Sequence, residues 1–340
     1  MTRNIKSEAN LMADYHVRPA AMDDLEDFHA LLIGYWETMT GVVKFTLEDF
    51  RNVFSTPGFN MESSMRVVLS PQGEMVGAVL VMDLSSPPVH PVVYGCVHED
   101  HEGQGIGTYL VQWGEQRARQ AISRVPDGVR VSMRLQTTPA HNPTVRLFEK
   151  LGIKPVRYSW FMLSELDENP PDPQWPEGIR ISSYQEYPHL DSIYRAVNEA
   201  FEDHWGYVDP EDFDERMERM RHSIEHDESF DASLWFIALE DDEIAGGALC
   251  SPRLGEDKEI GIVDTLGVRR PWRRQGLGLA LLHQAFGEFH RRGKARVGLS
   301  VDSENLTGAT RLYEKAGMHV AREFVLYEKE IHPGEELSKG

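Results

Sequence analysis

The chain has little cysteine, no long apolar run and a deficit of positive charge, and each absence narrows what it can be. Its 340 residues include two cysteines, Cys96 and Cys250, too few for a disulfide scaffold. No apolar run approaches the roughly 20 residues that a membrane-spanning helix needs. Residues 1–6 lack the apolar core of a signal peptide, so we predict a cytoplasmic protein without membrane contact.

The charge balance also restricts the possible partners. The chain has 35 Lys and Arg against 55 Asp and Glu, a net charge of -20 that would repel the phosphates of nucleic acid. This charge suits a cationic amine, although an acidic surface that favours solubility explains it without any ligand. His98 and His101 come nearest to a metal-ligand pair, but no thiolate cluster or third ligand accompanies them, so no metal site is predicted.

Residues 262–282 are typical of a strand, a charged turn and a helix. The turn, residues 273–278, has the sequence Arg-Arg-Gln-Gly-Leu-Gly and precedes apolar residues at helical spacing. Glycines before a helix let backbone N–H groups and the helix dipole face an anion, so this turn is a candidate phosphate site. The dinucleotide pattern fails at Leu281, where a small residue is required, and the P-loop lysine is absent. A glycine-rich turn without a ligand remains the alternative.

The same pattern occurs twice in the chain. Residues 93–107 align without a gap with residues 264–278, and residues 142–153 repeat the pattern of residues 305–318. A repeat at domain length indicates duplication. Between the copies, residues 169–176 hold four prolines, which favour an extended linker. We predict an N-terminal domain at residues 14–166, a linker at 167–177 and a C-terminal domain at 178–331.

Strands before helices, with a crossover at the glycine-rich turn, predict that each domain is of the α/β class with a mixed sheet. A strand at residues 156–163 is expected to close the sheet of the first domain. A strand at residues 324–329 is expected to close the sheet of the second.

The turn Arg-x-x-Gly-x-Gly after a strand, followed by an Asn, a Tyr and Lys-x-Gly, resembles the signature of the GNAT acetyltransferase superfamily. The duplication resembles the tandem, mycothiol synthase-type members of that superfamily. The resemblance implies that each domain has a mixed, mostly antiparallel sheet flanked by helices. It also implies acetyl-CoA as cosubstrate, with its pantetheine along the strand before the turn and its pyrophosphate on the turn. The cofactor-binding residues that it implies are Leu266, Gly267, Val268, Arg273, Arg274, Gln275, Gly276, Leu277, Gly278, Leu279 and Asn305, with Gly103, Gly105 and Gly107 in the first copy.

In that superfamily an acidic residue on the strand often serves as the base and a Tyr on the last helix protonates the leaving thiolate. Here the resemblance implies Asp264 and Tyr313 as catalytic residues, although many members carry Glu at the position of Ile262. Strand alternation puts positions 262 and 264 on one face, so Asp264 is expected to serve from a neighbouring place. The first copy has Val93 and Phe148 at these positions, and Glu102 in place of Arg273, so we predict that it is degenerate and that the C-terminal copy is catalytic.

The acceptor site in the superfamily is shaped by the first two helices of a domain and their connection. In the second copy this region contains Glu202, His204 and Tyr207, whose carboxylate and aromatic groups are suited to an ammonium ion. The predicted function is acetyl transfer from acetyl-CoA to a primary amine of a small molecule, by a monomer or homodimer. Two alternatives are mycothiol synthase-like acetylation of a cysteinyl pseudodisaccharide and a non-catalytic CoA-binding regulatory role.

Overall fold

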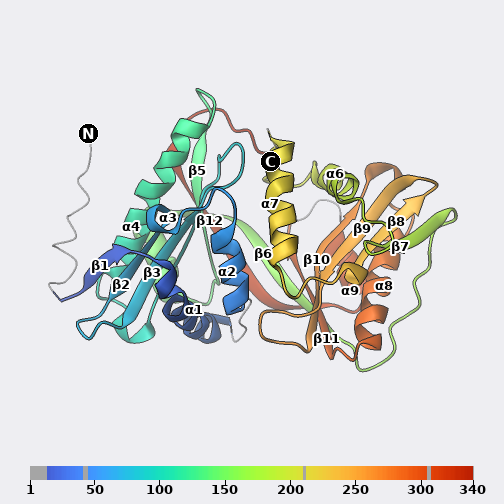
Figure 1. The fold of residues 1–340 in the computed structure, drawn as a ribbon, viewed down its shortest axis with the longest axis horizontal. Coiled ribbons are helices and arrows are strands. Elements are labelled where there is room, and N and C mark those ends of the chain that lie inside the picture. Colours follow the sequence, from blue (N-terminus) through green and yellow to red (C-terminus); the bar gives the residue numbers. More distant parts are fainter. Residues whose placement is uncertain (1–13, 41–44, 210–211, 305–307, 340) are drawn as a thin grey trace. The chain divides into compact units, whose positions relative to one another are not determined.

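The computed structural model of this chain describes residues 14–40, 45–209, 212–304 and 308–339 (Figure 1). The chain divides into two compact units. Unit 1 comprises Met1–Arg157, Pro210–His226 and Phe324–Leu337, and unit 2 comprises Tyr158–Asp209, Asp227–Glu323 and Ser338–Gly340. Among the residues that the structure describes, no helix is both long and apolar enough to cross a membrane.

Unit 1 is built on a sheet with the strand order β1-β2-β3-β4-β5-β12. Its strands pair antiparallel except for β4 and β5, which are parallel, so the predicted mixed and mostly antiparallel sheet is confirmed. The strands are β1 (His16–Pro19), β2 (Met65–Leu69), β3 (Met75–Met82), β4 (Val92–Val97), β5 (Val131–Thr137) and the part of β12 (His319–His332) from Phe324 onward. The helices are α1 (Leu25–Thr40), α2 (Leu47–Ser55), α3 (Met61–Ser64), α4 (Ile106–Ala118), α5 (Asn142–Lys150) and α7 (Phe213–His226).

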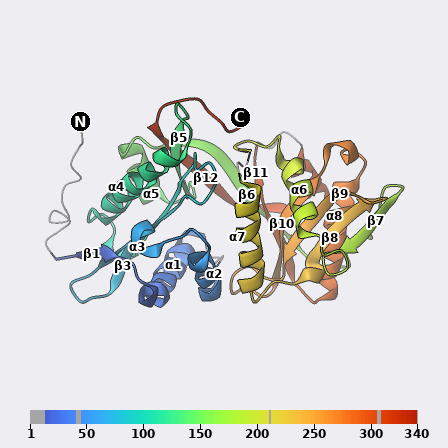
Figure 2. The ribbon, with the colours of Figure 1, turned by 45° about the horizontal axis from the view of Figure 1, so that its top comes forward.

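Helices cover both faces of this sheet, with α4 and α5 on one side and α1 and α2 on the other (Figures 1 and 2). Strand β3 contributes to both hydrophobic clusters, because successive side chains of a strand point to opposite faces. Val79 and Val81 pack towards α4, whereas Ala78 and Leu80 pack towards α1 and α2. A strand buried on both faces therefore forms the centre of the unit.

Unit 2 repeats this plan with the strand order β6-β11-β10-β9-β8-β7. Helices α8 and α9 pack on one face of its sheet, and α6 packs on the other. The strands are β6 (Lys154–Glu165), β7 (Ile179–Ser183), β8 (Trp235–Glu240), β9 (Glu243–Ser251), β10 (Ile260–Val268) and β11 (Arg296–Asp302), and the helices are α6 (Leu190–Phe201), α8 (Leu277–Arg291) and α9 (Ala309–Lys315).

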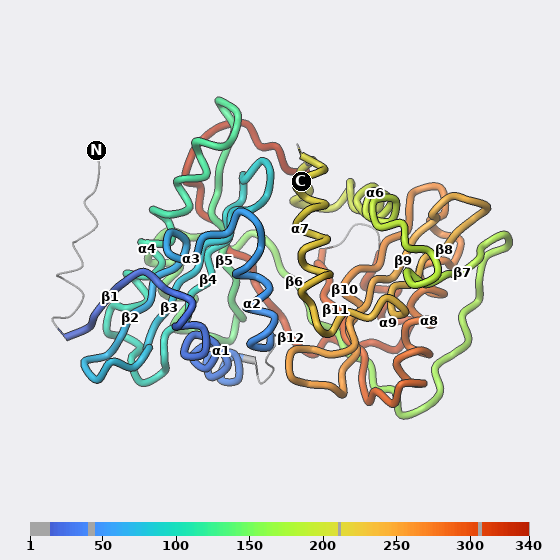
Figure 3. The backbone as a smooth tube through the Cα atoms, in the orientation of Figure 1, coloured from blue at the N-terminus to red at the C-terminus, as the bar shows by residue number. Residues whose placement is uncertain are grey.

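The closing strands of the two sequence copies are exchanged. The expectation that residues 156–163 close the sheet of the first copy is wrong, because Ser159–Glu165 of β6 pair with β11 in unit 2. Likewise Val325–His332 of β12, which follow the second copy in sequence, pair with β5 in unit 1. Figure 3 shows the red end of the chain running beside β5. Each sheet is therefore completed by a strand from the other copy.

In both units the two parallel strands pair only briefly and then separate. In unit 1, β4 meets β5 at the single pair Val92 and Arg134. In unit 2, β10 pairs with β11 over Ile260–Ile262 and not along its later residues. Helices α4 and α8 begin shortly after the ends of the separating strands β4 and β10. The fold thus places an open wedge between two strands beside the N-terminus of a helix in each copy.

Candidate active site

The turn before α8 in unit 2 has the backbone shape of an anion cradle. Arg274 has φ 63° and Gly276 has φ 91°, so two residues of the turn lie in the left-handed region. Alternation of such residues turns successive N–H groups towards one point ahead of the helix. A Cβ built at Gly276 would meet nothing within 4 Å, which shows open space in front of α8. Backbone geometry therefore supports an anion site where the sequence predicted one.

The rest of the predicted cofactor residues lie around this cradle. Gly278 packs closely, because a Cβ there would lie 3.5 Å from Leu312 and 3.8 Å from Val268 at the end of β10. The turn residues 274–276 are exposed, and Leu277 is buried beneath α8. The structure thus brings the strand end, Leu266–Gly267–Val268, together with the first turn of α8, which includes Leu279. Asn305 lies outside the described residues.

The first copy keeps the same cradle. Gly103 has φ 72° and Gly105 has φ 93°, which match Arg274 and Gly276 residue for residue. Gly107 packs against Leu147 as Gly278 packs against Leu312, with a built Cβ at 3.2 Å. Backbone N–H groups do not depend on the side chains that differ between the copies, so both units retain the geometry of an anion site.

The guanidinium group of Arg273 serves a structural purpose. It donates to both carboxylate oxygens of Asp203, at 2.5 and 3.1 Å, and to the backbone oxygens of Val268 and Ala200, at 3.0 and 2.9 Å. These bonds fasten the end of β10 to the end of α6. A Cβ on Gly267 would lie 3.2 Å from Ala200, so the two elements also touch directly. In the structure this side chain bonds to Asp203, and the contact with the cofactor that the resemblance implies stays a prediction.

Asp264 lies on a β-bulge in the middle of β10. Val263 pairs with Cys250 and Thr265 with Leu249, so Asp264 is the extra residue opposite β9. Bulges often lie next to active sites because they redirect a side chain. This bulge interrupts the alternation that would put residues 262 and 264 on one face: Ile262 is buried and Asp264 is exposed. No register shift occurs in β4, where Val93 stands at the equivalent position and pairs regularly with Val81.

The Asp264 carboxylate has the properties of a general base at neutral pH. Its side chain reaches solvent, but protein surrounds it on most sides, and this loss of hydration raises the pKa of Asp264 to about 6. The hydroxyl of Ser251 on β9 donates to Asp264 Oδ2 at 2.6 Å and acts in the opposite direction, lowering that pKa. A carboxylate that is ionised just below neutral pH is matched to proton abstraction.

Tyr313 lies in the main hydrophobic cluster of unit 2, with 8% of its surface exposed. Burial raises the pKa of Tyr313 to about 12, so the hydroxyl keeps its proton at neutral pH. In unit 1 the equivalent residue is Phe148, whose ring packs edge-on against Tyr327 with the ring centroids 5.0 Å apart. Only the second copy therefore offers a hydroxyl at this position.

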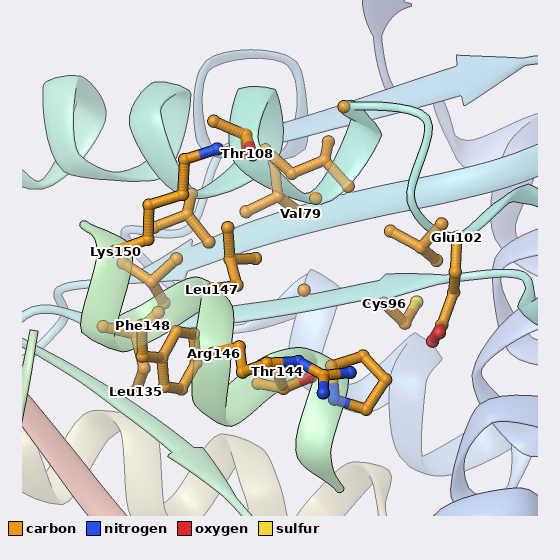
Figure 4. A pocket seen from close by; sticks show the side chains of 18 of the residues that line it. Val79, Cys96, Glu102, Thr108, Leu135, Thr144, Arg146, Leu147, Phe148 and Lys150 are labelled. Carbon is orange, nitrogen blue, oxygen red and sulfur yellow. The ribbon is translucent and has the colours of Figure 1, made fainter.

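A cavity of about 410 Å³ opens in unit 1 between β4, β5, α4 and α5 (Figure 4). Val93, Gly95, Phe148 and the cradle glycines Gly103, Gly105 and Gly107 line it. Figure 4 shows Lys150 of α5 extending towards Thr108 of α4, while Glu102 and Cys96 lie at the opposite end. Burial raises the pKa of the Cys96 thiol to about 12, which makes this thiol a poor nucleophile at neutral pH.

The three residues predicted to hold the acceptor follow the end of α6 in unit 2. Tyr207 accepts a hydrogen bond from Asn198 Nδ2 at 2.7 Å. His204 stacks edge-on against Phe201 with centroids 4.5 Å apart, and burial lowers the pKa of His204. The carboxylate of Glu202 contributes to raising the pKa of Tyr207, an effect in which burial is the largest cause. These side chains form one group that begins where α6 packs on β10.

One residue of this site, Ser251, was missed by sequence reasoning. It bonds to Asp264 across neighbouring strands, belongs to no motif and carried no signal in the sequence. Asp203 lies in the region after α6 that the resemblance assigns to the acceptor, but its bond to Arg273, 70 positions away, was not predicted.

Each of the two units thus joins a turn shaped to hold an anion to a pair of parallel strands that separate. The family model "Acetyltransferase (GNAT) family" matches residues 26–153 and 190–318. The chain therefore belongs to the GNAT acetyltransferase family, with a domain of that family in each half, and it is an acyltransferase.

Known relatives support the tandem arrangement. The chain is 27% identical to a mycothiol acetyltransferase of Catenulispora acidiphila over 76% of its length and 79% of the relative, and 28% identical to one of Thermobispora bispora over 75% and 80%. The crystal structure of a GCN5-related N-acetyltransferase from Sphaerobacter thermophilus matches with a TM-score of 0.75 and 36% identity over 95% of this chain and 98% of that one. A tandem GNAT protein from the clavulanic acid biosynthesis pathway matches in fold, with a TM-score of 0.68 and 16% identity over 95% of this chain and 100% of that one.

Proposed function

We propose that the protein transfers the acetyl group of acetyl-CoA to a primary amine of a small molecule, and that the second copy performs the reaction. The observation that carries this proposal is Asp264, an accessible carboxylate on a bulge of β10 whose pKa is raised to about 6. The first copy has an unbulged β4 with Val93 at that position. At this position of the strand, a base suited to an amine is therefore present in the second copy and replaced by valine in the first.

The reaction proceeds by direct attack. Asp264 accepts a proton from the amine, directly or through water, as the amine nitrogen bonds to the thioester carbon. A backbone N–H at the end of β10, near Val268, donates to the carbonyl oxygen as negative charge develops there. The C–S bond then breaks, and the Tyr313 hydroxyl donates to the departing sulfur and is reprotonated from solvent. Asp264 then releases its proton to solvent, and the products are the amide and free CoA.

The first copy is proposed to bind acetyl-CoA without turning it over. Its cradle has the same backbone shape as the second, and its cavity runs between β4 and β5 from that cradle. Lys150 extends towards Thr108 at the start of α4, where a positive charge favours an anion (Figure 4). Phe148 supplies no proton to a leaving thiolate. We therefore expect a CoA site in unit 1 that lacks the groups for chemistry.

Valine substitutions at the two cradles separate their contributions. Gly276 and Gly105 have φ 91° and 93° and equally open surroundings, so valine imposes the same backbone strain at both positions. We expect Gly276→Val to weaken the acetyl-CoA affinity of unit 2 by at least about tenfold. Gly105→Val should leave the turnover number within about threefold of the wild-type value. Calorimetry and steady-state kinetics measure both, and loss of turnover in Gly105→Val alone would assign the chemistry to the first copy.

The Tyr313→Phe substitution tests the proton donor. It removes one hydroxyl from a packed core position and keeps the ring, so the fold should persist. We expect the turnover number to fall by about 10²-fold, the lower end of general acid catalysis, while acetyl-CoA affinity stays the same. The matched variant Phe148→Tyr adds the same hydroxyl to unit 1 and should not raise turnover. An unaltered turnover number in Tyr313→Phe would assign thiolate protonation to water.

A second candidate acceptor comes from the relatives. They are named mycothiol acetyltransferases and match about three quarters of this chain, so a cysteinyl pseudodisaccharide is the competing substrate. Mass spectrometry of acetylated products, formed from acetyl-CoA and a cell metabolite extract, decides between this substrate and other amines. A product without a cysteinyl group would favour the broader class of small amines.

A further inference from the structure

Residues 338–339, which follow β12, return to unit 2 and lie on the loop of the proposed acceptor residues. The backbone N–H of Gly206 donates to the oxygen of Lys339 at 2.6 Å, and the N–H of Lys339 donates to the oxygen of Tyr207 at 2.9 Å. These two backbone bonds fix the position of Lys339 against this loop.

The ammonium group of Lys339 is held by an aromatic face and a carboxylate. Its Nζ lies 4.7 Å from the centroid of the Tyr207 ring and 3.9 Å from Asp209 Oδ1. Asn198 fixes the ring through its bond to the Tyr207 hydroxyl. The Lys339 and Asp209 side chains are 46% and 76% exposed, so their ion pair is weak and another cation can reach the same place.

The electrostatic surroundings of the ring favour a cation. Burial is the largest cause of the raised pKa of Tyr207, and the carboxylates of Asp209 and Glu202 raise it further. Two negative groups therefore act on a ring whose face already attracts cations. Lys339 supplies one positive charge against the two carboxylates of Asp209 and Glu202, so these three groups leave a net negative charge beside the ring.

The loop is connected to the proposed site of acetyl transfer. It begins at the end of α6, where Ala200 packs against Gly267 of β10 and accepts a bond from Arg273. Tyr207 follows Ala200 by seven positions within the same unit. It is one of the residues that the family resemblance assigns to the acceptor, so we take a group bound at Tyr207 to be part of the acceptor.

We propose that Tyr207 and Asp209 form a subsite for an alkylammonium group of the acceptor, and that Lys339 occupies this subsite as an intramolecular competitor. This inference rests on the proposed function. An amine that attacks a thioester must be neutral, so the ammonium ion in the subsite belongs to a second amino group of the same molecule. The substrate class is a small primary amine that carries a further cationic amine.

A binding experiment without acetyl-CoA tests the subsite. We would titrate the full-length protein with 1,4-diaminobutane by calorimetry and use 1,4-butanediol as the uncharged probe. Lys339→Gln removes the competing charge and keeps the backbone bonds, so it should bind the diamine at least about tenfold more tightly than wild type. Lys339→Arg keeps the charge and should retain the wild-type affinity. Adding Tyr207→Leu to Lys339→Gln should abolish the gain, and the diol should bind to none of them.

The outcomes separate this inference from the proposed function. Equal diamine affinity in wild type and Lys339→Gln, or an equal gain for the diol, overturns the subsite. A protein that acetylates no amine but shows the predicted titrations would retain the subsite and refute the proposed function. Where acetylation occurs, the ratio of KM for 1,4-diaminobutane to KM for n-butylamine should fall by at least about fivefold in Lys339→Gln. Deletion of residues 338–340 removes the same ammonium group and should give the same gain if Lys339→Gln is misfolded.

Discussion

Asp264→Asn is expected to lower kcat/KM by about 10⁴-fold at neutral pH, the upper end of what a general base supplies. Asparagine has the shape of aspartate and still accepts the bond from Ser251, so the bulge of β10 should keep its form. Folding raises the pKa of Asp264 above its ordinary value, so ionisation of this group opposes folding, and its removal should not destabilise the protein. Initial rates and a thermal unfolding midpoint measure the two effects. If Asp264→Asn kept the wild-type activity, Asp264 would not be the general base.

The pH dependence of kcat/KM tests the role of Asp264 independently of the substitution. The base acts only when ionised, so wild-type kcat/KM should fall as the pH drops through about 6, the pKa of Asp264. Ser251 donates to the ionised carboxylate and lowers this pKa, so Ser251→Ala should raise it and move the acidic limb to higher pH. An acidic limb that stays in place in Ser251→Ala would mean that another group titrates.

Local features of this fold could be predicted from the sequence because short-range sterics determine them. The cradle requires left-handed residues, which glycine adopts readily, and Gly105 and Gly276 both adopt positive φ. The pattern Thr46-x-x-Asp49 predicts a capping box, and both of its hydrogen bonds are present at the start of α2. In these cases the residues that specify the geometry lie within a few positions of one another.

Features that depend on distant partners could not be predicted. The bulge at Asp264 leaves no mark in the sequence of β10, because it arises from the register against β9. The guanidinium group of Arg273 has the same charge whether it meets a phosphate or Asp203, so its motif did not reveal its partner. Strand pattern likewise shows which residues are apolar and not which strand they pair with. For that reason the exchange of β6 and β12 was missed.

The strand exchange predicts that the first sequence copy is unstable by itself. In unit 1, β12 pairs with β5 and buries Val325, Tyr327 and Ile331. Its Glu328 bonds to Arg130 at 2.5 Å and to Arg134 at 3.1 Å. Each apolar side chain contributes about 1.5–3 kcal/mol, and loss of one partner from a buried ion pair costs about 3–5 kcal/mol. Together these are comparable with the whole stability of a typical domain, about 5–15 kcal/mol.

We therefore expect residues 14–166 to unfold at much lower urea concentration than a matched chimera in which residues 14–153 continue through a flexible linker into residues 324–337. The first fragment has its own strand, β6, with which to cover β5. By the alignment of the two copies Leu163 would then stand where Glu328 belongs, and both arginines would lose this carboxylate. Urea unfolding midpoints, followed by circular dichroism, compare the two proteins. Glu328→Leu should lower the free energy of unfolding of the chimera by at least about 3 kcal/mol. Equal midpoints for fragment and chimera would show that either strand completes the sheet and that the exchange does not contribute to stability.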